Sequence, residues 1–126
     1  MADLAVGVIG YGLRGGLSRH AHRPGEGSRV VALYDPDVEA HGRFRKAFDS
    51  DPALRTTTEL EEFLGYGLDA VFVISPDYLH EEHALAVLEA GISVYLEKPM
   101  AITTEGCDRI LAAAQKSGGR LYLGHN

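Results

Sequence analysis

Six short apolar segments recur along the chain, separated by amphipathic stretches and by clusters of glycine, proline and polar residues. Each is four to six residues long and rich in β-branched or aromatic side chains, which is typical of strands buried in a sheet. They cover residues 4–9, 29–34, 54–57, 70–75, 92–97 and 120–124. The intervening segments predict helices over 13–20, from Pro36, from Thr58, over 77–90 and from Thr103 or Thr104, and residues 21–28 predict a loop.

Turn chemistry marks where several of these helices begin and end. Asp35 and Pro36 form a typical start, with aspartate as the cap and proline at the first helical position. Thr58 and Glu61 form a capping box, and Gly91 stops the 77–90 helix. The side chains predicted to face the core are Ala40, Phe44, Ala47 and Phe48, then Leu60, Phe63 and Leu64, then Ala84, Val87 and Leu88, and finally Cys107, Ile110, Leu111 and Ala114.

Strands and helices that alternate through short loops predict right-handed crossovers and a parallel sheet covered on both faces. Six strands in this arrangement suit the α/β, Rossmann-type doubly wound fold with strand order 3-2-1-4-5-6. The 126 residues fit one domain, which we take to be residues 1–126.

Composition narrows the class of protein. Hydrophobic residues make up 45% of the chain, and the net charge of −6 comes without a basic run, which argues against nucleic acid or an anionic membrane surface as a partner. Nothing approaches a membrane span, and the N-terminus is typical of a first strand rather than a signal peptide. The single cysteine excludes an internal disulfide, so we predict a cytoplasmic protein.

A glycine-rich turn follows the first strand and opens a helix. Gly10, Gly12 and Gly15 form a G-x-G-x-x-G pattern, in which the first glycine makes the tight turn, the second lets the backbone approach a pyrophosphate and the third allows close helix–strand packing. The N–H groups at the start of that helix favour a phosphate. The segment thus predicts a dinucleotide site formed by Gly10, Tyr11, Gly12, Leu13, Arg14 and Gly15.

An acid stands at the end of the second strand, where a Rossmann fold binds the adenosine ribose. Asp35 occupies that position, and it can serve there as a helix cap, as a ribose ligand or as both. A carboxylate repels a 2′-phosphate, Asp37 adds negative charge, and no arginine is immediately adjacent in the sequence. These features predict NAD as the cofactor in preference to NADP.

Parallel strands bring their carboxyl ends to one edge of the sheet, which is where such folds bind ligands. The residues after the fourth strand should therefore lie over the cofactor, with Ser75 and Pro76 as a wall and His80 facing the site. Ser75 or Asp77 is also placed to cap the next helix. His80 and His83 lack a third ligand, so we predict no metal site. His20, His22 and His41 are predicted to be solvated.

The fifth strand ends in Glu97, Lys98 and Pro99, and proline cannot continue a sheet. These charges either mark a solvated strand end or point Lys98 into the cofactor edge. The stretches "GVIGYGLRG", "ISPDYLHEEHALAVLEAGISVYLEKPMA" and "LGHN" resemble the N-terminal domain of the glucose–fructose oxidoreductase, inositol dehydrogenase and rhizopine catabolism (Gfo/Idh/MocA) family over essentially the whole chain.

The resemblance implies an NAD(P)-dependent oxidoreductase that acts on sugars, cyclitols or related hydroxy and keto compounds. It implies that Lys98 is catalytic and contacts both the substrate hydroxyl and the nicotinamide ribose, that Glu97 binds near that ribose, and that the Lys98–Pro99 peptide bond is cis. His80 matches the histidine of the family's Pro-x-x-x-His stretch. Such a lysine stabilises a developing alkoxide and relays its proton.

Members of this family carry a second, α+β domain that supplies substrate contacts and the homo-oligomer interface, and we expect it to be absent from these 126 residues. The chain should then bind a dinucleotide without turnover. Two alternatives stay open. One is a sensor or co-repressor of the same fold that does no redox chemistry, and the other is an enzyme for another substrate, such as an imine or a biliverdin-like tetrapyrrole.

Overall fold

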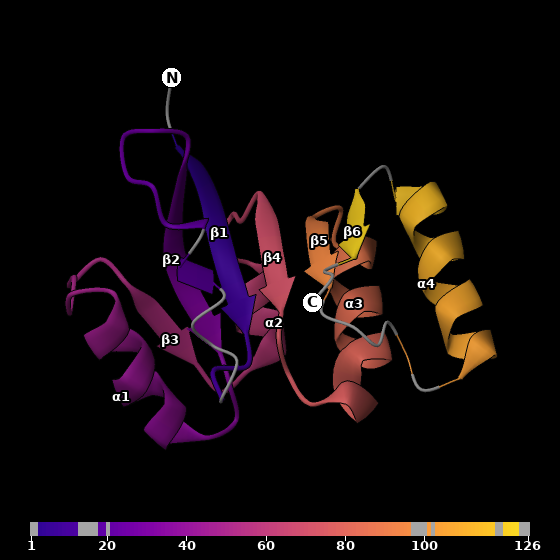
Figure 1. Ribbon diagram of the computed structural model, residues 1–126, viewed down its shortest axis with the longest axis horizontal. Coiled ribbons are helices and arrows are strands. Elements are labelled where there is room, and N and C mark those ends of the chain that lie inside the picture. The colour runs from indigo at the N-terminus through magenta and orange to yellow at the C-terminus, as the bar shows by residue number, and fades with distance from the viewer. Residues whose placement is uncertain are drawn as a thin grey trace.

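The computed structural model describes residues 3–12, 18–19, 21–96, 101, 103–117 and 120–123. Its centre is a parallel sheet of six strands in the order β3-β2-β1-β4-β5-β6 (Figure 1). The strands are β1 (Leu4–Ile9), β2 (Ser28–Tyr34), β3 (Arg55–Thr57), β4 (Ala70–Val73), β5 (Ser93–Leu96) and β6 (Leu121–Leu123). The doubly wound sheet predicted from the sequence is confirmed, including the strand order.

The helices form the crossover connections that parallel strands require. They are α1 (Val38–Ala47), α2 (Leu60–Leu64), α3 (His80–Glu89) and α4 (Thr104–Ser117), with a 3-10 turn η2 (Asp77–Leu79) before α3. In Figure 1, β3, β2 and α1 form one end of the molecule and α4 the other. The predicted helix over 13–20 falls largely outside the described residues. None of the described helices is long and apolar enough to cross a membrane.

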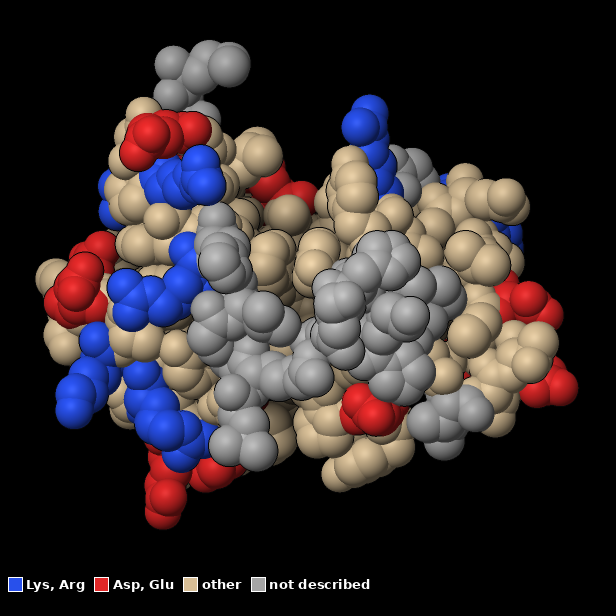
Figure 2. Space-filling model, viewed as in Figure 1, with Lys and Arg blue, Asp and Glu red and all other residues tan. Residues whose placement is uncertain are grey.

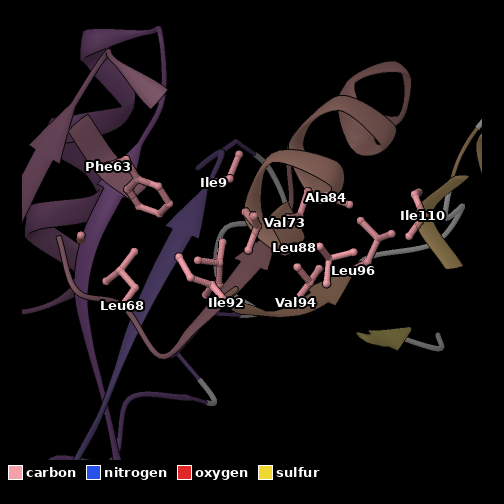
Figure 3. Close-up of a cluster of buried hydrophobic side chains, with 13 residues drawn as sticks. Ile9, Phe63, Leu68, Val73, Ala84, Leu88, Ile92, Val94, Leu96 and Ile110 are labelled. Atoms are coloured by element: carbon pink, nitrogen blue, oxygen red, sulfur yellow. The ribbon is translucent and has the colours of Figure 1, made fainter. Parts of the chain in front are cut away.

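Two hydrophobic clusters fill the two faces of the sheet. One joins strand residues to Phe63 of α2, Leu88 of α3 and Ile110 of α4 (Figure 3), and the other joins strand residues to Phe44 of α1. Gly7 of β1 lies under the first cluster, where a Cβ would come within 2.6 Å of both Phe63 and Leu68. The end of β1, Val6–Ile9, is thus buried on both faces, as its apolar run predicts. In β4 and β5 buried positions alternate with partly buried ones, and Tyr122 of β6 is 52% exposed.

The predicted starts of two helices are wrong by one or two residues. The cap of α1 is Asp37, whose Oδ1 accepts the Glu39 N–H at 3.0 Å. Asp35 does not cap it, because its carboxylate accepts the N–H groups of Tyr11 and Asp37 instead. At α2 no capping box forms: the cap residue is Glu59, and its own N–H bonds to Thr57 Oγ1.

The start of α4 is as predicted, since Thr103 Oγ1 accepts the Gly106 N–H at 2.9 Å. Ile110 and Ala114 pack on the core as predicted, but Cys107 and Leu111 are not the buried residues beside them. Gly106 and Ile110 are the buried residues of α4, whereas Leu111 is 47% exposed and Cys107 is only half-buried. The cause is close packing: a Cβ on Gly106 would lie 2.6 Å from the Glu81 carboxylate of α3.

Two histidines expected in solvent are partly buried and hydrogen-bonded. His22 Nδ1 accepts the Val30 N–H at 3.1 Å, and its ring meets Phe48 edge-on with the ring centroids 5.0 Å apart. His41 Nε2 donates to the carbonyl oxygen of Asp35 at 2.8 Å. The prediction of solvated side chains is therefore wrong for His22 and His41, because the loop and helix that carry them fold back on β2.

Candidate functional site

The glycine turn after β1 requires glycine at its first position. Gly10 has φ of +89°, and a Cβ there would lie 2.7 Å from Ser75 Cα, so any other residue is strained and clashes with backbone. Its N–H donates to the Tyr34 carbonyl oxygen at 3.0 Å. A Cβ on Gly12 would meet nothing within 4 Å, so the second glycine presents bare backbone to open space. These features fit the roles that the G-x-G pattern predicts.

Asp35 links the glycine turn to the end of β2. Its Oδ2 accepts the Tyr11 N–H and its Oδ1 accepts the Asp37 N–H, each at 2.9 Å. Each carboxylate oxygen can accept more than one hydrogen bond, and the described residues supply one donor to each. The carboxylate is therefore held in a fixed orientation at the strand end, and its bonds to the described residues leave acceptor capacity for ligand hydroxyls.

Ser75 and two buried histidines form the wall opposite the glycine turn. Ser75 Oγ lies 2.7 Å from His83 Nδ1, and His80 Nε2 donates to the Ser75 carbonyl oxygen at 2.7 Å. All three residues are buried. Ser75 is therefore committed to α3 and does not cap a helix, and neither η2 nor α3 has a side-chain cap, so the capping prediction for Ser75 or Asp77 is wrong.

A pocket of about 430 Å³ opens between these walls at the carboxyl edge of the sheet, a volume usual for small-molecule sites. It brings together six residues predicted to bind a cofactor, namely Gly10, Tyr11, Gly12, Asp35, Ser75 and Pro76. His80 does not line it, because its ring is 1% exposed and lies behind the Ser75 backbone. Among the described residues, no group of three His, Cys, Asp or Glu side chains could hold a metal ion.

Several lining residues were not among the predicted site residues. Tyr34, Arg43, Tyr78 and His83 all face this pocket, and Tyr78 is 70% exposed at its rim. The position of Tyr34 as the last residue of β2 could have signalled its role. Arg43 lies within α1, and its guanidinium reaches the Tyr11 carbonyl oxygen at 3.2 Å. No local sequence pattern marks that contact, which depends on how α1 packs.

Burial shifts the pKa values of two side chains in the pocket wall. It lowers the pKa of the His83 imidazole below its usual value, against smaller opposing effects of the Glu82 and Asp35 carboxylates. His83 therefore favours the neutral form, which suits a ring that meets Tyr34 edge-on at 5.8 Å. Burial likewise raises the pKa of the Tyr11 hydroxyl, while Arg19 and Arg43 act in the opposite direction.

The remaining predicted site residues lie outside the described part of the chain. They are Leu13, Arg14, Gly15, Glu97 and Lys98, together with the Lys98–Pro99 bond. Their roles stay predictions. What the structure does fix is the end of β5: Leu96 pairs with Val73 of β4, so β5 ends at the same edge as the strand that leads into Ser75.

A family model described as an oxidoreductase family with an NAD-binding Rossmann fold, Gfo/Idh/MocA, matches residues 4–125. Inositol 2-dehydrogenase 1 of Saccharopolyspora erythraea is 39% identical over 117 residues, which cover 92% of this chain and 34% of that protein. The chain thus spans about a third of the length of the curated relatives it matches.

Solved structures agree with this assignment. The WlbA dehydrogenase from Bordetella pertussis, in complex with NADH and UDP-GlcNAcA, superposes with a TM-score of 0.82 at 28% identity, over 98% of this chain and 35% of that one. GenD2 from gentamicin A biosynthesis, in complex with NAD, gives a TM-score of 0.84 at 30% identity over the same shares.

Proposed function

The chain belongs to the Gfo/Idh/MocA oxidoreductase family, and from this premise we propose that residues 1–126 are the dinucleotide-binding domain of an NAD(P)-dependent oxidoreductase. The whole enzyme would transfer a hydride to or from a sugar, cyclitol or related hydroxy or keto compound. The observation that carries the proposal is the pocket at the carboxyl edge of the sheet, where the Gly10–Gly12 turn, Asp35 and the Ser75–Pro76 wall meet.

The described residues fit a dinucleotide in two places. The bare backbone at Gly12 allows the close approach that a pyrophosphate needs, and the positive φ of Gly10 lets the chain turn there without a side chain. The lone pairs of Asp35 that the described residues leave open suit the hydroxyls of the adenosine ribose. Ser75 and Pro76 would cover the opposite side of the cofactor.

Lys98 is the proposed catalytic side chain, with Glu97 beside the nicotinamide ribose. In the oxidation, the carbinol carbon gives a hydride to the nicotinamide, and the hydroxyl gives up its proton. A lysine close to that oxygen stabilises the alkoxide as it develops and accepts or relays the proton. The supporting observation is that β5, two residues before Lys98, ends beside β4 at the pocket edge.

Cofactor binding by this chain tests the proposal directly. We expect isothermal titration calorimetry with NAD⁺ and NADP⁺ to show binding of both, with the smaller dissociation constant for NAD⁺, because Asp35 and Asp37 line the pocket and repel a 2′-phosphate. Asp35→Asn, which keeps a hydrogen-bond acceptor but removes the negative charge, should narrow the difference between the dissociation constants for NAD⁺ and NADP⁺. Failure to bind either nucleotide would contradict the proposed function, and tighter binding of NADP⁺ would contradict the cofactor preference.

A further inference from the structure

A carboxylate and a guanidinium join α3 to α4. Arg109 of α4 donates from Nε to Glu81 Oε2 and from Nη2 to Glu81 Oε1, the latter at 3.0 Å. Two parallel N–H···O bonds fix the orientation of both planar groups, which a single contact does not. The Arg109 guanidinium also lowers the pKa of the Glu81 carboxyl, so the pair stays charged around neutral pH.

The same carboxylate lies against the first turn of α4. A Cβ on Gly106 would be 2.6 Å from Glu81 Oε1 and 3.0 Å from Ala101 Cβ. Gly106 is buried, its N–H donates to Thr103 Oγ1 at 2.9 Å, and Ala101 packs on the hydrophobic core. Glu81, Gly106 and Ala101 therefore form one close contact, which depends on the missing side chain at position 106.

This contact follows closely on the residue proposed to be catalytic. Ala101 is three positions after Lys98 in the sequence, and Leu96, the last residue of β5, is two positions before it. Leu96 and Ile110 of α4 belong to the same hydrophobic cluster (Figure 3). The described contacts thus hold the chain on both sides of residues 97–100.

The first turn of α3 is also fixed to the wall of the pocket. His80, which precedes Glu81, is 1% exposed, and its Nε2 donates to the Ser75 carbonyl oxygen at 2.7 Å. Glu81 therefore projects from a helix end that is tied to the pocket wall. Through Glu81, the position of that wall determines where α4 begins.

We propose that Glu81 and Arg109 are positioning residues for the proposed hydride transfer: their ion pair holds the start of α4 against α3, and so keeps Ala101 where Lys98 reaches the edge of the pocket. The inference rests on the proposed function and deepens it, because it names two residues that act through Ala101. Neither side chain lines the pocket at the carboxyl edge. Proton transfer needs heavy atoms within about 3 Å of each other, so a shift of Ala101 should affect turnover more than cofactor binding.

Steady-state kinetics of the full-length protein test the pair. We expect Glu81→Gln and Arg109→Gln each to lower kcat by about tenfold, a smaller loss than the one that a full misplacement of the lysine would cause. The dissociation constant for NAD⁺ should change by less than about twofold. The double variant should lose little more than either single variant, because one change already breaks the pair.

Arg29→Gln is the matched control. It also removes an ion pair of an exposed arginine, in this case with Asp3 and Asp51, and Arg29 does not line the pocket. Arg29 belongs to β2, at the end of the molecule away from α4, and Figure 2 shows Lys and Arg side chains gathered over that end. Its kcat should stay that of the unmodified protein. Thermal unfolding of each variant would show that the fold is retained.

Competitive acetylation gives a second readout that needs no turnover. The chain has three lysines, at positions 46, 98 and 116, and Lys46 is exposed on α1. Mass spectrometry can therefore follow the reactivity of Lys98 against that of Lys46 as the pH is raised. The midpoint of this curve reports the surroundings of the Lys98 amine.

The two variants separate displacement of Lys98 from a direct effect of charge. A direct effect would move the Lys98 midpoint in opposite directions in Glu81→Gln and Arg109→Gln, because the charges removed are opposite. Displacement breaks the same contact in both variants, so we expect the midpoint to move in the same direction in both. Arg29→Gln should leave it unchanged.

Three results would overturn the proposal. They are an unchanged kcat in both variants, a loss of kcat that Arg29→Gln reproduces, and Lys98 midpoints that stay in place or move in opposite directions. Failure of the proposed function looks different, because the unmodified full-length protein would then bind no NAD⁺ or form no NADH with any polyol or sugar. In that case the acetylation curves alone decide whether the pair holds Lys98 in place.

Discussion

At Gly10 the two walls of the pocket touch. The turn after β1 passes so close to the Ser75 backbone that a Cβ would lie 2.7 Å from Ser75 Cα and 2.8 Å from Ser75 N. Both neighbours are main-chain atoms, which cannot rotate aside as the end of a side chain can. A single residue without a side chain thus sets the spacing between the glycine turn and the Ser75–Pro76 wall.

Gly10→Ala should therefore damage both stability and binding. A positive φ of 89° and a backbone clash add strain that we expect to lower the free energy of unfolding by about 2 kcal/mol or more. NAD⁺ affinity should fall as well, because relief of the clash separates the walls. Urea denaturation and calorimetric titration measure the two effects.

Gly42→Ala is the matched control. Gly42 lies inside α1, and a Cβ there would meet nothing within 4 Å. Alanine should raise the free energy of unfolding by about 0.5–1 kcal/mol, because glycine is a poor helix former. Equal stability of the two variants would show that Gly10 is not under the strain described.

Residue types and spacing predicted Gly10, Asp35 and Ser75 at one edge, because strand ends can be read from apolar runs. They did not predict which acid caps α1: Asp35 and Asp37 are chemically alike, and the choice depends on the Tyr11 N–H, which is 24 positions away from Asp35. Arg43 was missed for the same reason. Its position at the pocket depends on how α1 is rotated, and the contact of buried Phe44 with the Tyr11 ring sets that rotation.

At the scale of elements, two buried hydrogen bonds tie Ser75, just after β4, to His80 and His83 of α3. His83 is 3% exposed, and its Nδ1 lies 2.7 Å from Ser75 Oγ. The groups that act on the imidazole charge are Glu82 on its own helix, His80 one turn before it, and Asp35 across the pocket. Burial, aided by His80, outweighs the two carboxylates and lowers the pKa of His83, so the folded protein binds a proton at this site less readily than the unfolded chain.

Acid should therefore weaken the fold through His83. Between the lowered folded pKa and the unfolded value of 6.5, the unfolded chain binds a proton that the folded chain does not, so stability rises with pH in that window. The contribution is fully present above pH 6.5 and is lost as the pH falls below it. The free energy of unfolding, measured in urea from pH 7.5 down to pH 5, should decrease accordingly.

His83→Asn separates this contribution from others, because asparagine can offer a hydrogen-bonding group to Ser75 without titrating. The variant should show a shallower fall in stability with acid. Some fall should remain, since burial also lowers the pKa of His22. An unchanged slope in His83→Asn would contradict the assignment to His83.

All six strands were predictable because short apolar runs between breakers leave few alternatives. The buried face of α4 was predicted only in part, for Ile110 and Ala114. Helical spacing allows two sets of positions to face the core, namely 107, 110, 111 and 114 or 106, 110 and 113. The close approach to α3 selects the set with glycine at its start. The ion pair between Glu81 and Arg109 lies across the same contact.

At the scale of the whole molecule, the sheet brings the carboxyl ends of β1, β2 and β4 around one pocket and sets the end of β5 beside them. These strand ends form the edge at which we propose that a dinucleotide binds. The chain spans about a third of its relatives, 34% of the inositol 2-dehydrogenase 1 noted above, so the substrate contacts of the proposed enzyme would lie largely in other parts of a longer protein.

Lys98→Met in the full-length protein distinguishes an enzyme from a sensor of the same fold. We expect the NAD⁺ dissociation constant to stay within about twofold and kcat to fall by about 10²–10⁴, the usual contribution of a proton-transfer group. Lys116→Met, which removes a charge from the exposed end of α4, should change neither.

Residues 1–126 alone should bind NAD⁺ and form no NADH from a polyol, and substrate-dependent NADH formation by them would contradict the division into domains. If Lys98→Met kept full turnover, proton transfer would have to come from another group. The full-length protein could also bind NAD⁺ and fail to form NADH with any polyol or sugar. That result would favour a sensor over an enzyme, because a sensor has no reaction in which the lysine takes part.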